Sequence, residues 1–126
     1  MNVHLRHAYA MHRLIEHFDR LPNGPKALLI CTHAASMICI GRCLTGKLPD
    51  DLDTEDFRCG TCAMSTYKRR SGPPPDASKL GKWDASKPDD IPSIDSWFNG
   101  TGVGGGWDCE KNGDCSFLSG GEERTW

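Results

Sequence analysis

The sequence predicts an α/β fold made of a helix–strand–helix unit followed by edge strands. The first observation is the order of an amphipathic stretch, an apolar run and a second apolar stretch within residues 3–46. The second is an alternating stretch from Phe57 to Arg69. Helices and buried strands that alternate along a chain are typical of parallel sheets covered by helices. A chain of 126 residues forms one domain or part of one.

An amphipathic helix is predicted for residues 3–21. Apolar side chains recur there at the three- and four-residue spacing of one helix face, at Ala8, Met11, Leu14, Ile15, Phe18 and Leu21. The prolines and glycine of residues 22–25 end this helix. His4, His7 and His12 do not share one face, so we interpret them as packed or solvated side chains and not as metal ligands.

The next apolar run begins at Ala27, ends in Thr32-His33, and predicts a strand buried on both faces. The stretch from Ile38 to Leu44 predicts a helix closed by Gly46. His33 would then lie beyond the carboxyl end of a strand and beside the free amides of a helix start. Open α/β sheets hold anionic ligands at such junctions, so we expect an anion site there.

The alternating residues 57–69 predict one further strand, entered through a bend at Gly60. We interpret the basic run Lys68-Arg69-Arg70 as its solvated end. These elements define a partial core at 1–70, followed by a flexible linker at 71–96 that is rich in Pro, Asp, Ser and Lys. The glycine-rich tail at 97–126 would close with a hairpin across Asn112-Gly113.

Composition excludes several classes of protein. The formal net charge of −2 provides no field that would recruit nucleic acid or an anionic membrane surface, and no apolar run reaches membrane-spanning length. The N-terminus lacks the pattern of a secretory signal, and seven cysteines then favour reduced thiols over a disulfide framework. We expect a nuclear or cytoplasmic protein that is not secreted.

Several segments resemble the second half of a histidine phosphatase of the phosphoglycerate mutase-like superfamily. Thr32-His33-Ala34 and the following helix at 38–46 resemble its second-histidine region. Residues 56–63 resemble its next edge strand, and residues 112–118 are similar to its closing strand. Residues 107–109 with 115–124 resemble more narrowly a fungal branch that includes the phosphatase-like subunit of the transcription factor TFIIIC.

The resemblance implies a partial, truncated three-layer sandwich and a phosphate site. In that superfamily a first histidine in an Arg-His-Gly motif is the nucleophile, and a second histidine with two arginines binds the phosphoryl group. His33 matches this second catalytic histidine, and Thr32, His33 and Ala34 would form the phosphate-binding residues. No cofactor or metal is implied.

The nucleophile of the family has no good match in this chain. Arg6-His7-Ala8 resembles Arg-His-Gly only superficially, because it lies at the start of the predicted first helix and lacks the glycine. Nothing matches the acid donor, and Glu16 reads as a solvent-facing helix residue. We therefore expect a truncated family member that is non-catalytic alone and binds phosphate or a phosphorylated small molecule at most. Completed upstream, it would be a phosphomonoester hydrolase.

Two other hypotheses remain open. Cys59, Cys62, Cys109 and Cys115 could supply four thiolates to a zinc-binding interaction module, although the second pair is widely spaced. Alternatively, the chain is an interaction piece of a transcription complex, with Trp97, Trp107 and Trp126 either as anchors for a protein partner or packed onto the sheet. Neither hypothesis involves a membrane or direct contact with nucleic acid.

Overall fold

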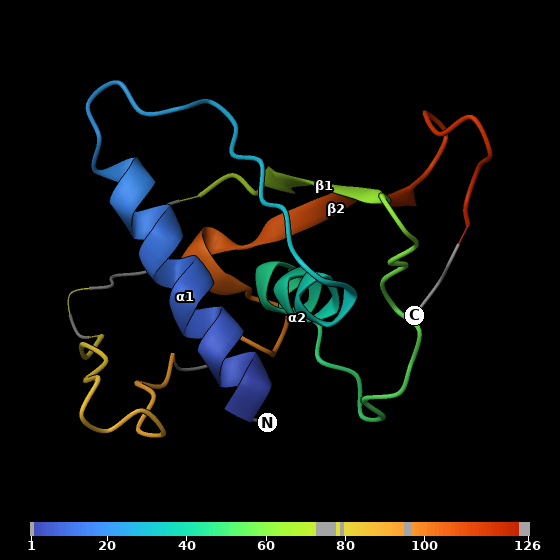
Figure 1. Cartoon of the computed structure of the whole chain (residues 1–126). Coiled ribbons are helices and arrows are strands. Elements are labelled where there is room, and N and C mark those ends of the chain that lie inside the picture. The colour runs from blue at the N-terminus through green and yellow to red at the C-terminus, as the bar shows by residue number, and fades with distance from the viewer. Residues whose placement is uncertain (1, 73–77, 79, 95–96, 124–126) are drawn as a thin grey trace.

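The computed structural model describes residues 2–72, 78, 80–94 and 97–123. In chain order these residues form the elements α1 (Asn2–Asp19), α2 (Ala34–Thr45), β1 (Met64–Arg69), the short 3-10 helix η2 (Val103–Gly105) and β2 (Trp107–Asp114). The predicted mixture of helices and strands is confirmed, but the sheet in the described residues is a two-stranded antiparallel one and not a parallel one. Figure 1 shows α1 crossing beside α2, with the β1–β2 ribbon running past both helices.

Both predicted helices are confirmed. The apolar stripe of α1 buries Ala8 and Met11 against the rest of the molecule. The C-terminus of α2 is closed by Gly46, which has a left-handed φ of 73° and donates its N–H to the Arg42 carbonyl at 2.9 Å. A glycine is favoured at this position because other residues pay a steric cost in the left-handed region. Neither described helix is long and apolar enough to cross a membrane.

One hydrophobic core joins the two ends of the chain. Ala8 and Met11 from α1 pack with Cys43 and Leu44 from α2, and with the tail residues Trp97 and Val103. Trp97 is only 1% exposed and Val103 is fully buried. The first and third parts of the predicted division therefore share their core.

The buried strand predicted from Ala27 to Thr32 is wrong. These residues form no strand and are exposed, with Leu29 reaching 78% exposure. The physical reason is that α1, α2 and the tail fill the core among themselves, while no described strand lies beside this run to pair with it. The segment instead passes over the surface between the two helices (Figure 1).

The strand predicted for residues 57–69 is confirmed only in its second half, as β1. The predicted hairpin is wrong, because Asn112-Gly113 lies inside β2 and not in a turn. β1 pairs with β2 from Arg69↔Trp107 to Met64↔Asp114, and the register shifts twice between Met64 and Tyr67. Such bulges admit extra residues into one strand of an antiparallel pair.

Part of the predicted linker is attached to α1. The Tyr9 hydroxyl accepts a hydrogen bond from the Trp83 amide at 2.8 Å, and Arg13 donates to the carbonyls of Leu80 and Gly81 at 3.2 and 2.7 Å. Residues 73–77, 79 and 95–96 of the same linker lie outside the described residues, as do residues 124–126 of the tail, including the candidate anchor Trp126.

Candidate functional site

The junction before α2 carries the predicted phosphate site. His33 is the N-cap residue, with φ −82° and ψ 160°, and its side chain makes no capping hydrogen bond. Its carbonyl accepts a hydrogen bond from the Met37 amide at 2.9 Å, which starts the helix. Thr32 and His33 are exposed, and Ala34 is half-buried. The residues of the predicted site are thus adjacent and accessible, but they follow an exposed coil and not a buried strand.

The electrostatics of this helix start favour an anion. The first turn of α2 contains no acidic residue, and no described residue accepts a hydrogen bond from the amides of Ala34, Ala35 or Ser36. Unpaired amides at a helix N-terminus carry a partial positive charge and attract anions. The arrangement can hold an oxyanion through backbone donors and the His33 ring.

The arginines of a complete phosphatase site are not gathered at this junction. Most described arginines already hold other groups, as the residues Arg13, Arg20, Arg42, Arg58, Arg69 and Arg70 do. Arg6 and His7 lie in the first turns of α1, and the His7 ring donates from Nδ1 to the Val3 carbonyl at 2.7 Å. These two residues are therefore part of a helix and do not form the strand-end motif of a nucleophile.

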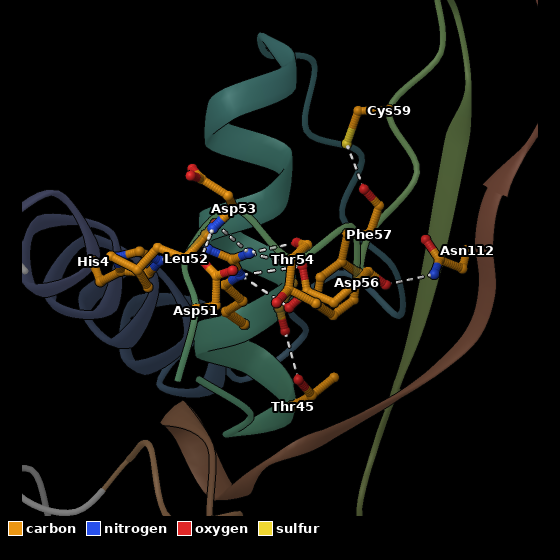
Figure 2. A network of polar contacts seen from close by, with 12 residues as sticks. His4, Thr45, Asp51, Leu52, Asp53, Thr54, Asp56, Phe57, Cys59 and Asn112 are labelled. Carbon is orange, nitrogen blue, oxygen red and sulfur yellow. Dashed lines mark hydrogen bonds and ion pairs between the residues drawn. The ribbon is translucent and has the colours of Figure 1, made fainter. Parts of the chain in front are cut away.

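A second polar cluster, the Arg42 network, forms at the opposite end of α2 (Figure 2). The buried Arg42 side chain donates from Nε and Nη2 to the two carboxylate oxygens of Asp56, both at 2.9 Å. Nη2 also donates to the carbonyls of Leu52 and Thr54 at 3.1 and 3.0 Å. This two-pronged contact fixes the 52–56 loop against α2 and leaves the Asp56 carboxylate occupied.

His4 completes the Arg42 network from α1. Arg42 Nη1 lies 3.4 Å from His4 Nε2, and a guanidinium can only donate, so Nε2 must be the unprotonated ring nitrogen. Nδ1 then carries the hydrogen, and it is buried with no partner among the described residues. Burial, followed by the Arg42 charge, lowers the pKa of His4, so the folded protein favours the neutral form of this ring.

Asn112 links the same loop to the sheet. Its Nδ2 donates to the Asp56 carbonyl at 2.9 Å, and its Oδ1 accepts the Arg58 amide at 2.9 Å. The next residue, Gly113, has a positive φ of 66°, and a Cβ there would meet the Arg58 backbone. The Asn-Gly pair that predicted a hairpin therefore serves to hold the 56–58 segment against β2.

A cavity of about 430 Å³ lies between α2 and the sheet, and it does not include Thr32, His33 or Ala34. Its lining residues are Thr45, Lys47, Asp56, Phe57, Arg70, Asp108, Cys109 and Asn112. Arg70 is committed to Asp108 at 2.8 Å and to the carbonyls of Gly100 and Thr45 at 2.8 and 3.1 Å. Arg70 and Asp108 of the lining are thus paired with each other, and the Asp56 carboxylate is held by Arg42.

The basic run at the end of β1 is structural. Besides these Arg70 contacts, Arg69 donates to both carboxylate oxygens of Asp19, each at 2.8 Å, and to the Gly104 carbonyl. The interpretation of these two arginines as a solvated strand end is therefore wrong. They connect β1 to α1, to α2 and to the tail.

The structure does not assemble the predicted zinc module. All seven cysteines lie within the described residues, and there no group of three or more His, Cys, Asp or Glu side chains is arranged to hold a metal ion. Cys109 lies in β2 opposite Tyr67, whereas Cys59 is buried and directs its thiol to the Phe57 carbonyl. Desolvation raises the pKa of both thiols, which disfavours the thiolate form that zinc requires.

Trp97 and Trp107, the two candidate anchors within the described residues, pack inward. Trp97 lies in the core, and Trp107 packs against it with the Arg69 guanidinium over its ring at 5.5 Å. The sequence left open whether these tryptophans anchor a protein partner or pack the tail onto the rest of the molecule, and packing is observed for both of them. Neither side chain is placed as a surface anchor.

The Arg42 network is the feature that sequence reasoning missed. One signal was available: an arginine inside the apolar stretch Ile38 to Leu44 is seldom buried unless it is paired. Its partners lie in a polar loop that contains several acidic residues. The sequence pattern does not distinguish among them, so the pairing of Arg42 with Asp56 could not be predicted.

Comparison with protein-family models, with curated proteins and with solved structures finds no significant match to this chain. The function is therefore inferred from the geometry of the described residues.

Proposed function

We propose that this chain is a non-catalytic, histidine phosphatase-like binding module that holds a phosphoryl group at the start of α2. Thr32, His33 and Ala34 are its binding residues, and the finer phosphoglycerate mutase-like fold is part of the same proposal. A small phosphorylated molecule or a phosphorylated group on a protein partner in a transcription assembly is the ligand class.

The observation that carries the proposal is the uncapped start of α2. An exposed His33 precedes three amides that have no acceptor among the described residues, and no carboxylate competes for them in the first turn. Backbone amides aimed outward from a helix start bind phosphate oxygens, and a histidine ring beside them adds a donor. Ser36 in the same turn contributes a hydroxyl that is close in sequence to these donors.

The proposed lack of turnover is supported by the positions of His7 and of the paired arginines. Phosphoryl transfer through a covalent intermediate requires a nucleophile and a proton donor within hydrogen-bonding reach of the bound group. His7 lies inside α1 and bonds the Val3 carbonyl, and arginines such as Arg42 and Arg69 are held in ion pairs. These side chains therefore supply neither a nucleophile nor a proton donor. Binding alone is then the expected activity.

The proposal is tested by titrating the isotope-labelled chain with inorganic phosphate and with phenyl phosphate while following its amide resonances. We expect saturable shifts of the amides of Ala34, Ala35 and Ser36, with a dissociation constant on the order of 1 mM, equivalent to about −4 kcal/mol. Substitution His33→Ala should weaken the binding. His17→Ala, which removes an exposed histidine from α1, is the matched control and should leave it unchanged.

Two outcomes contradict the proposal. The first is the absence of saturable shifts at α2, and the second is equal binding by His33→Ala and the unaltered chain. Hydrolysis of phenyl phosphate above the buffer rate that disappears in His33→Ala would contradict the non-catalytic part alone.

A further inference from the structure

The residues Ala27 to Thr32, called here the 27–32 segment, form an uncharged and apolar stretch on the surface. Leu28, Leu29 and Ile30 are 49%, 78% and 40% exposed. No described residue forms a hydrogen bond with the backbone of this segment. Free backbone groups next to exposed apolar side chains are the features of an unpaired strand, which binds another chain by adding a strand.

The order of residues in the segment matches a second copy of itself. Antiparallel strands related by a twofold axis place opposite residues on the same face, so such a pairing is centred on one residue. With the axis at Leu29, this leucine lies opposite Leu29 of the second copy, and Leu28 lies opposite Ile30. Leu29 then meets its counterpart on one face of the pair, and Leu28 meets Ile30 of the second copy on the other face.

Charge is compatible with the same register. Lys26, at the edge of the segment, lies opposite Thr32 of the second copy, so no like charges meet. The paired residues carry no charge that would need a complementary partner. The partner of this segment must therefore be an uncharged, apolar strand. The same segment of a second copy of the chain has this chemistry.

We propose that the 27–32 segment is a dimer interface, in which two copies of this chain pair as antiparallel strands centred on Leu29. The segment forms a strand in the dimer and remains a coil in the single chain (Figure 1). His33 lies outside the paired residues, so the interface leaves the amides at the start of α2 free.

The first test is the oligomeric state of the full chain by analytical ultracentrifugation over a range of concentrations. We expect a reversible dimer, and we expect Leu29→Asp to weaken it at least about tenfold, because it places two carboxylates opposite each other. Leu29 is mostly exposed, so this variant should fold as the unaltered chain does. The matched control is Phe117→Asp, which alters another exposed apolar residue and should leave the dimer intact.

The second test measures the register. In the proposed pairing, position 27 lies opposite Cys31 of the second copy, so Ala27→Cys places two thiols across the interface. Oxidised glutathione converts such a thiol pair to a disulfide and is itself reduced to glutathione, giving a covalent dimer on a non-reducing gel. Ala35→Cys, an exposed position beyond the paired residues, is the control and should cross-link more slowly.

If ultracentrifugation shows a monomer at every concentration, the proposal is overturned. The 27–32 segment would then bind a different partner or none. Association that persists in Leu29→Asp, or equal cross-linking by Ala27→Cys and Ala35→Cys, also overturns it. Loss of phosphate binding without loss of the dimer contradicts only the function proposed for α2, since the two measurements are independent.

Discussion

The two ends of α2 differ sharply. At its C-terminal end Arg42 is buried, and its donors reach the Asp56 carboxylate, two loop carbonyls and His4. At its N-terminal end the amides of the first turn and the His33 ring have no acceptor among the described residues. We call the Arg42 end saturated, because its donors are paired and stabilise the fold. We call the His33 end unsaturated, because its donors have no acceptor among the described residues and are available to bind. Within the described residues, one helix thus carries paired donors at one end and unpaired donors at the other.

The first prediction should give the largest effect and concerns the saturated end. Arg42→Met leaves the Asp56 carboxylate and the carbonyls of Leu52 and Thr54 without their donor. Breaking a buried ion pair from one side costs about 3 kcal/mol, whereas an exposed pair contributes less than about 1 kcal/mol. Urea unfolding should therefore show a large drop for Arg42→Met and a small one for Arg20→Met, whose side chain is 74% exposed. Equal effects would remove the contrast between a structural and a surface arginine.

The second prediction concerns the residue that ends α2. Gly46→Ala places a Cβ about 2.7 Å from the Trp97 carbonyl oxygen, in addition to the strain of a left-handed φ. Gly121 has a similar φ of 69° but open space around it, so Gly121→Ala reports the strain alone. We expect Gly46→Ala to lower the unfolding free energy by about 2 kcal/mol and Gly121→Ala by about 1 kcal/mol. A reversed order in thermal or urea unfolding would show that the close approach of the tail to α2 is not required.

The third prediction is a pH dependence that arises from two buried histidines of α1, one of them in the Arg42 network. Burial and Arg42 lower the pKa of His4, and burial also lowers that of His12, from the ordinary value of 6.5. The folded state therefore disfavours the charged form of both rings, so their contribution to stability is fully present above about pH 6.5 and is lost as the pH drops below it. The urea midpoint measured between about pH 8 and pH 5 should decrease on acidification. In His4→Gln the decrease should be smaller, and an unchanged slope would contradict the burial of a neutral His4.

The smallest effect is expected at the unsaturated end. His33→Ala removes an exposed ring that makes no hydrogen bond to the described residues. Its unfolding free energy should stay within about 0.5 kcal/mol of the unaltered chain, even though we expect the proposed phosphate binding to weaken. A substantial loss of stability in the same urea experiment would mean that this end of α2 also supports the fold.

Local patterns predicted the helices well. The apolar stripe placed α1 within two residues of its observed end, and Gly46 was identified as the residue that closes α2. Both signals depend on near neighbours in the sequence, which is why they could be read without tertiary information. The same reasoning placed His33 beside a helix start, which is a local feature, but the strand predicted before it does not form.

The wrong predictions depend on distant partners. An apolar run at 27–32 reads as a buried strand, yet whether it is buried depends on whether another strand lies beside it. Asn112-Gly113 satisfies the pattern of a hairpin, but Asn112 instead binds the backbone of Asp56 and Arg58. Arg69 and Arg70 read as a solvated run because their acceptors, Asp19 among them, lie far away in the sequence.

The shared core also determines when the protein can fold during its synthesis. Ala8 and Met11 lie near the start of the chain, while Trp97 and Val103, which cover them, lie near its end. Contacts between such distant residues form slowly, because a long loop must close before they become favourable. On the ribosome, α1 can pack against α2 once residue 45 has emerged, but the part of the core that Trp97 and Val103 complete stays open until those residues follow.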